Sequence, residues 1–301
     1  MAAPNPRLSI GFPVYNGEQY IRQALDSILA QTYCDFEIVI SDNASVDSTA
    51  SICQEYAVKD SRIRYFRQEH NVGAAANFNF VFSQARGELF KWAAHDDVLH
   101  PEFLEECIAA LDALPDVILA YTKVNRIDAQ GDITGAYDYP MRVDHPLPSV
   151  RFGDLILINH FCVAVFGVIR TEFLAQTPLI APFVGSDRTL LAELGLRGRL
   201  CEVDRYLFNR RDHPLASTRA YRHHRRLSWF DPRQRDMIHL PYWRNGFEYL
   251  RLVIKVPLVP AERLKCIGLI ARWLWLKRKQ LIDDFKGIAL QLFPFRRVAT
   301  R

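Results

Sequence analysis

The 301-residue sequence lacks the usual signals of a secreted, zinc-binding or membrane-spanning protein. Its six cysteines are scattered, with no CxxC pair and no cluster with histidine, which argues against a zinc site and a disulfide framework. The first ten residues have neither the basic start nor the apolar run of a signal peptide. No stretch approaches the roughly 20 apolar residues of a spanning helix. These absences predict a cytoplasmic location.

Sequence motifs for binding phosphate or nucleic acid are missing too. The segment after the first predicted strand, residues 13–17, is neither a P-loop nor a G-x-G-x-x-G pattern. No DNA- or RNA-binding motif accompanies the basic residues, which disfavours a nucleic-acid partner. The net charge of +4 is unevenly spread, with 16 Lys/Arg and 25 Asp/Glu in residues 1–200 but 22 and 9 in residues 201–301. The basic tail therefore predicts an anionic partner.

What the first 125 residues do contain is an alternation of strand and helix patterns. Strands are predicted at 8–12, 36–40, 63–66, 89–93 and 117–124, and helices after Asn16, Ser45, Gly73 and Pro101. Asn16 is predicted to cap the first helix, with Gln19 reaching back, and Ser45 to cap the second. The alternation favours a mostly parallel sheet flanked by helices, with ligands bound at the carboxyl ends of its strands.

Polar residues at such strand ends are the first candidates for chemistry. Asp42 follows the second strand and could accept a hydrogen bond from a nucleotide base or ribose, or serve only as a turn residue. His95-Asp96-Asp97 follows the fourth strand. Adjacent carboxylates there suit a divalent cation on substrate phosphates, although a solvated turn before the helix at Pro101 is the alternative.

Two later sites are further candidates. Asp187 opens a predicted helix at 189–196 and is either a general base for an acceptor hydroxyl or an N-terminal helix cap. Arg210, Arg211 and His213 precede Pro214, and they could meet a diphosphate and its metal, or form a basic surface turn.

The order of these motifs resembles family-2 glycosyltransferases. The resemblance is carried by FPVYNGE (12–18), ALDSILAQTY (24–33), SDNASVDST (41–49), NVG (71–73) and HDD (95–97). It is dense over about residues 8–100 and looser through Asp187 to His213. The resemblance implies a GT-A fold, with a nucleotide-binding half at about 1–125, an acceptor half at about 126–215, and a basic, mainly helical extension at 216–301.

The same resemblance implies roles for single residues. Pro13, Tyr15 and Glu18 would line the nucleoside pocket, Asp42 would contact the base, and Asp96 would face the ribose or donor sugar. Asp97 would ligate Mn²⁺ or Mg²⁺ on the diphosphate, near His213, Arg210 and Arg211. Asp187 would be the catalytic base.

Two departures from the family pattern affect these roles. The family usually has Asp-x-Asp, whereas His95 takes the first place here, so metal ligation rests on Asp97. The family base usually follows Glu or Gln, whereas Ser186 precedes Asp187.

The implied activity is an inverting, metal-dependent transfer of a sugar from a nucleoside-diphosphate sugar to an acceptor hydroxyl, in cell-surface polysaccharide or glycolipid synthesis. A carboxylate deprotonates the nucleophile while a metal neutralises the leaving diphosphate. The alternatives are a nucleotidyltransferase that makes nucleotide-sugars and a non-catalytic nucleotide-sugar binder.

The basic tail carries a separate pattern. Residues 267–279 mix Trp273, Trp275 and aliphatic residues with Lys and Arg, as a helix in a membrane interface does. This pattern predicts peripheral attachment to an anionic membrane, and the alternative is a helix packed on the catalytic domain. The cluster of arginines and histidines at 219–226 is interpreted as either a lid over the acceptor or a solvated loop.

Overall fold

The computed structural model describes residues 5–214, 216, 229–231, 233 and 240–292, with side chains described up to residue 285. The strands of this part form one sheet with the order β3-β2-β1-β4-β8-β6-β9-β5, and β7 pairs with β6. Their bounds are β1 (Leu8–Val14), β2 (Phe36–Asp42), β3 (Ile63–Arg67), β4 (Leu89–Trp92), β5 (Val98–Leu99), β6 (Val117–Ile127), β7 (Ile133–Tyr137), β8 (Val168–Arg170) and β9 (Arg199–Arg211).

The parallel part of the sheet is its N-terminal half, β3-β2-β1-β4. Beyond β4 the sheet is mixed, because β8 pairs antiparallel with both β4 and β6, while β9 pairs parallel with β6. The predicted α/β class with a GT-A type sheet is confirmed. β8, at three residues, is too short for its sequence pattern to predict.

Helices cover both faces of the sheet. Their bounds are α1 (Ile21–Leu29), α2 (Thr49–Lys59), α3 (Ala74–Ser83), α4 (Phe103–Ala113), α5 (Pro148–Leu157), α6 (Thr171–Leu174), α7 (Ser186–Arg197) and a 3₁₀ turn η1 (Val163–Phe166). Side chains alternate along each strand, so β1 directs Leu8, Ile10 and Phe12 to the core shared with α1, α2 and α4. Phe90 and Trp92 of β4 face the opposite core, which α3 and α7 close.

α3 begins directly after Gly73 as predicted, but α1 and α2 begin later than predicted, and their predicted caps are wrong. The cap position of α1 is Tyr20 and that of α2 is Ser48, and neither makes a side-chain capping bond. The side chains of Asn16 and Ser45 instead bind across two neighbouring loops. From the sequence alone, a side chain that caps its own helix cannot be distinguished from one that hydrogen-bonds to an adjacent loop.

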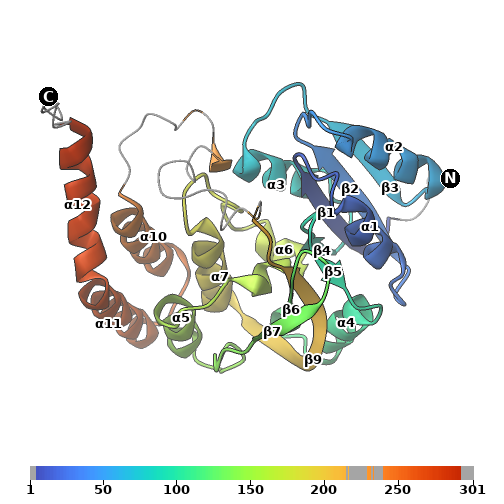
Figure 1. The fold of residues 1–301 in the computed structure, drawn as a ribbon. Helices are drawn as coiled ribbons and strands as arrows, with labels where there is room; N and C mark the ends of the chain where they lie inside the picture. Colours follow the sequence, from blue (N-terminus) through green and yellow to red (C-terminus); the bar gives the residue numbers. More distant parts are fainter. Residues whose placement is uncertain (1–4, 215, 217–228, 232, 234–239, 293–301) are drawn as a thin grey trace, which may run out of the picture.

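The C-terminal helices α10 (Pro241–Lys255), α11 (Pro260–Leu276) and α12 (Arg278–Leu292) lie at the end of the molecule opposite β1, β2 and β3 (Figure 1). A third apolar core, which includes Tyr249, Val253, Cys266 and Trp273, joins α10 and α11 to α5 and α7. The helix predicted around the tryptophans is therefore packed on α5, with Trp273 buried in this core. None of the described helices has the length and apolar character needed to cross a bilayer.

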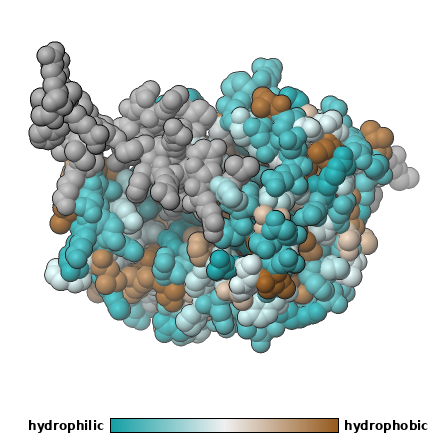
Figure 2. Space-filling view, in the orientation of Figure 1, coloured by the Kyte–Doolittle hydropathy of each residue, from teal (hydrophilic) through white to brown (hydrophobic). Residues whose placement is uncertain are grey.

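Polar surface dominates the face seen in Figure 2, but apolar residues gather at its lower left, in the region of α11. Large side chains that remain exposed on the C-terminal helices include Phe247, Ile254, Leu264 and Trp275. Packing against α5 and α7 has therefore not covered all the apolar surface of these helices.

Candidate functional site

The loops that follow β1 and β2 are tied together. Five hydrogen bonds cross between them, and they join Asn16 N–H to Ser45 Oγ (2.9 Å), Gly17 N–H to Thr49 Oγ1 (2.8 Å), Glu18 N–H to Asp47 Oδ2 (3.2 Å), Val46 N–H to Asn16 Oδ1 (3.0 Å) and Ser48 N–H to Glu18 Oε2 (2.9 Å). Both loops lie at carboxyl ends of adjacent parallel strands, where ligands bind in such sheets. Glu18 thus fixes the second loop, and its predicted contact with a nucleoside stays a prediction.

The other residues predicted for the nucleoside pocket lie on or beside these strands. Pro13 is buried within β1, and the ring of Tyr15 is exposed just beyond it. Asp42, the last residue of β2, is fully buried, and its carboxylate accepts bonds from Ser45 N–H (2.8 Å) and the Tyr65 hydroxyl (3.1 Å). Arg67 approaches the same carboxylate at 3.6 Å. In this structure Asp42 therefore shapes the loop, and contact with a base stays a prediction.

Asp96 and Asp97 lie between β4 and β5, against the end of β9. Asp97 Oδ1 accepts from the backbone N–H of Arg211 at 2.9 Å, and Asp96 Oδ2 lies 2.9 Å from Nε2 of His213. The side chain of His95 lies against Gly17, since a Cβ on that glycine would come within 2.7 Å of it. The structure therefore brings together three segments, 16–18, 95–97 and 211–213, that are far apart in the sequence.

The two carboxylates differ in their proton affinity. Burial acts to raise the pKa of Asp96, but the hydrogen bond with His213 and the nearby charges of His95 and His213 outweigh it and lower the pKa. Burial and the repulsion from Asp96 raise the pKa of Asp97 to about 7. A positive charge near Asp97 would favour its ionised form.

The two arginines of this region have different surroundings. Arg210 Nη1 donates to the Tyr137 hydroxyl at 2.8 Å, and its guanidinium lies 5.0 Å from the ring centre of Phe161. Arg211 is 2% exposed. Its guanidinium donates to the backbone oxygens of Asp96, Asp128 and Ala129 and to the side chain of Gln23. The guanidinium of Arg211 therefore holds the loops together, and Arg210 is the better placed of the two to reach a phosphate.

The donor set around Asp97 and His213 fits a divalent cation on a diphosphate. His213 Nδ1 is buried and has no hydrogen-bond partner among the described residues, so it can act as a ligand while Nε2 binds Asp96. The described part of the chain holds no group of three or more histidine, cysteine, aspartate or glutamate side chains arranged for a metal. A cation here would therefore take its remaining ligands from substrate phosphates and water, as Mg²⁺ often does.

Asp187 lies in the first turn of α7 and is partly exposed. Its Oδ1 accepts from the N–H of Arg188 at 2.8 Å, and it neighbours the buried thiol of Cys162, whose pKa burial and the Asp187 charge raise. No hydrogen bond between described residues joins Asp187 to Asp96 or Asp97. The two sites are linked indirectly. Asp187 neighbours Cys162, the adjacent Phe161 contacts Arg210, and the backbone of Arg211 binds Asp97.

An aromatic cluster between these two sites was not identified from the sequence. Tyr137 and Phe161 have ring centres 4.8 Å apart, Tyr139 stacks on Tyr137 at 6.2 Å, and Arg210 contacts the first two rings. Phe161 is 53% exposed, so one side of its ring is open to solvent. The cluster at 219–226, interpreted as either a lid or a solvated loop, lies outside the described residues.

Comparison with known proteins matches residues 9–176 to the model of glycosyl transferase family 2. The chain is 38% identical over 125 residues to an uncharacterised glycosyltransferase of Rickettsia typhi, covering 41% of this chain and 38% of that protein. It is 31% identical over 157 residues to chondroitin synthase of Escherichia coli, covering 52% of this chain and 22% of the synthase. The chain therefore spans well under half the length of these relatives.

Solved structures agree with the fold. S. aureus TarS 1–349, in complex with UDP-GlcNAc, matches 95% of this chain and 81% of its own with a TM-score of 0.66 at 15% identity. The mannosyltransferase PcManGT of Pyrobaculum calidifontis, in complex with GDP-Man and Mn²⁺, matches 97% of this chain and 83% of its own with a TM-score of 0.51 at 18% identity. Because the family model covers more than half of the chain, the chain belongs to glycosyltransferase family 2.

Proposed function

We propose that this glycosyltransferase moves a sugar from a nucleoside-diphosphate sugar to an acceptor hydroxyl and inverts the anomeric carbon. The observation that carries the proposal is the meeting of Asp96, Asp97 and His213 beside the β1–α1 loop. The structural neighbours were solved with UDP-GlcNAc and with GDP-Man, which supports a nucleotide-sugar as donor. A relative named chondroitin synthase supports polysaccharide synthesis as the setting.

Asp97 and His213 are the residues that would hold Mn²⁺ or Mg²⁺ on the donor diphosphate. When bound, the divalent cation supplies Lewis-acid neutralisation of the charge that develops on the leaving nucleoside diphosphate. Asp96 keeps His213 oriented through their 2.9 Å contact. Arg210, which is held by Tyr137, adds a positive charge on the same side.

Asp187 would be the base that accepts the proton of the acceptor hydroxyl. It is partly exposed at the start of α7, so an acceptor can reach it. An inverting transfer needs in-line attack by the acceptor and no nucleophile from the protein. The base and the diphosphate site would therefore lie on opposite sides of the reacting carbon, with the Tyr137–Phe161 cluster between them.

Substitution of Asp187 by Asn tests this assignment. The amide keeps the size of the side chain but cannot take the proton, so turnover should fall by about 10² to 10⁴-fold while the nucleoside diphosphate still binds. Calorimetric titration beside a rate assay measures both quantities. Asp204→Asn is the control, because the Asp204 side chain is 86% exposed on β9 and pairs with Lys123 at the surface. Near-normal turnover in Asp187→Asn would remove it from the mechanism.

The nucleotidyltransferase and binder alternatives gain no support. A nucleotidyltransferase would be expected to carry a glycine-rich phosphate loop with a lysine after β1, whereas this loop is Pro13–Gly17 and is hydrogen-bonded to the β2–α2 loop. The products formed from nucleotide-sugars distinguish a glycosyltransferase, a nucleotidyltransferase and a non-catalytic binder.

We also propose that the extension at 216–301 attaches the enzyme, with its catalytic part at 1–215, to an anionic membrane surface. On α10, four exposed apolar residues recur at helical spacing along one face: Trp243, Phe247, Leu250 and Ile254. On α11 a second stripe holds Leu264, Ile267 and Trp275. Lys265 and Arg272 on α11 are exposed cations beside these stripes. Apolar stripes beside cations suit the headgroup region of a bilayer.

A further inference from the structure

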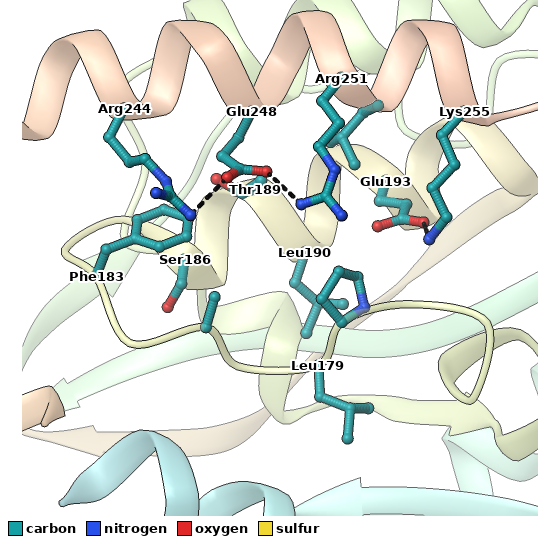
Figure 3. A pocket seen from close by; sticks show the side chains of 13 residues that line it. Leu179, Phe183, Ser186, Thr189, Leu190, Glu193, Arg244, Glu248, Arg251 and Lys255 are labelled. Atoms are coloured by element: carbon teal, nitrogen blue, oxygen red, sulfur yellow. Dashed lines mark hydrogen bonds and ion pairs between the residues drawn. The ribbon is translucent and has the colours of Figure 1, made fainter.

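A pocket lies between α7, α10 and the segment 178–183, away from the donor site. Its walls carry three cations from one face of α10, Arg244, Arg251 and Lys255, as Figure 3 shows. The guanidinium of Arg244 lies 5.2 Å from the ring centre of Phe183 on the facing segment. The enclosed volume is about 60 Å³. Since a single water needs about 10–15 Å³, this volume has room for a small ion.

The charge of this pocket is positive after its own ion pairs are counted. Glu248 pairs with Arg244 at 2.8 Å and with Arg251 at 3.3 Å. Glu193 pairs with Lys255 at 3.2 Å and with Arg197 at 2.6 Å. The lining thus holds three cations and two buried carboxylates, which leaves one positive charge, and Arg197, outside the lining, also pairs with Glu193. The side chains of Arg244 and Arg251 are each 55% exposed, so they keep donors for a ligand.

Ser186 supplies an independent sign of a ligand. It lines the pocket and is 1% exposed, and its hydroxyl has no hydrogen-bond partner among the described residues. A buried hydroxyl without a partner costs free energy, so such groups in folded proteins call for a specific explanation. A small anion in the pocket would accept a hydrogen bond from this hydroxyl.

We propose that this pocket binds a phosphate group. A tetrahedral oxyanion satisfies the Ser186 hydroxyl and matches the guanidinium donors of Arg244 and Arg251. A carboxylate ligand has fewer oxygens to share among three cations and a hydroxyl. The pocket thereby differs from the donor site, where aspartates would meet a metal-bound diphosphate.

The place of the pocket assigns the phosphate to the acceptor, an assignment that rests on the proposed function. Ser186 and the proposed base Asp187 both lie in the first turn of α7, so the pocket lies at the same end of this helix as the base. On α10 the cationic residues 244, 251 and 255 lie beside the exposed apolar stripe of Phe247 and Ile254. One helix therefore presents an apolar face to a membrane and an adjoining cationic face to the pocket. An acceptor linked to lipid through phosphate fits this pairing.

Titration with inorganic phosphate in EDTA, followed by calorimetry and by the rise in Tm, tests the pocket. Arg251→Gln and Ser186→Ala should each weaken phosphate binding about tenfold or more. Ser186→Ala should not lower the Tm without phosphate, because its hydroxyl has no hydrogen bond to lose within the described part of the chain. Lys265→Gln is the matched control, since Lys265 pairs with Glu262 at 2.8 Å on α11, outside the pocket. Asp97→Asn separates the pocket from the donor site and should leave phosphate binding unchanged.

The outcomes are distinct. No phosphate binding, or equal binding in wild type, Arg251→Gln and Ser186→Ala, overturns the proposal whatever the enzyme does with nucleotide-sugars. Loss in those two variants alone supports it, even if no sugar transfer is found. Phosphatidylglycerol vesicles then identify the source: unchanged phosphate affinity in their presence supports an acceptor phosphate. Competition by the vesicles supports the pocket but overturns its assignment to the acceptor in favour of a lipid headgroup.

Discussion

His160 is a buried histidine whose hydrogen bonds require a neutral ring. Its Nε2 lies 3.0 Å from the Leu155 oxygen, and its Nδ1 accepts from the Cys162 N–H at 3.1 Å, so the neutral ring satisfies both partners. Burial, with the charge of Arg188, lowers its pKa from 6.5 to about 4. Protonation of Nδ1 would place two donors against each other.

This arrangement predicts a loss of stability in acid. Between pH 6.5 and about 4 the unfolded chain binds a proton that the folded chain does not, so the free energy of unfolding falls as the pH falls and levels off below 4. His160 contributes roughly 3 kcal/mol to this fall. Denaturant titrations from pH 7 to pH 4 should give a shallower slope for His160→Gln. The same change at exposed His70 should leave the slope unaltered, and an identical slope in both variants would contradict the prediction.

Single residues also mark the limit of prediction from sequence. Asp96 and Asp97 could be selected because carboxylates at a strand end are costly without a partner. Arg210 and Arg211, by contrast, look equivalent in the sequence. The guanidinium of Arg211 is buried because it binds Asp96, Asp128 and Gln23, each more than 80 residues away in the sequence.

At the scale of elements, the β1–α1 loop depends on the backbone of Asn16. This residue has φ = 50°, a left-handed conformation that asparagine and glycine tolerate better than alanine. Asn16→Ala should cost roughly 1–2 kcal/mol of stability through strain and the lost bond to Val46, and it should weaken nucleotide binding. Asn16→Gly keeps the backbone free and should cost less. Equal stability of the two variants, measured by denaturant titration, would rule out strain as the cause.

The exposed stripes of α10 and α11 make the membrane proposal testable. Phe247 and Ile254 are each 65% exposed, so their replacement by Gln should not disturb the core but should reduce sedimentation with phosphatidylglycerol vesicles several-fold. Val58 on α2 is 89% exposed, and Val58→Gln should bind vesicles as the wild type does. High salt should weaken binding, because it screens the cations. If the wild type does not sediment with the vesicles, the membrane proposal is wrong.

Across the whole molecule, the parallel half of the sheet was predictable and the mixed half was not. Runs such as 8–12 and 36–40 are apolar because both faces of those strands are buried. The antiparallel insertion of β8 between β4 and β6 depends on pairing across about 80 residues, which no local pattern records. The site could not be predicted for the same reason, because the contact between His213 and Asp96 joins residues 117 positions apart in the sequence.

The most direct test of the account is the product formed from a panel of nucleoside-diphosphate sugars, with Mn²⁺ or with EDTA. The account predicts that the wild type releases nucleoside diphosphate in the presence of Mn²⁺ and that Asp97→Asn lowers the rate by about 10²-fold or more. Release that is equally fast in EDTA and in Asp97→Asn would contradict it, as would formation of nucleoside triphosphate and sugar 1-phosphate when pyrophosphate is added.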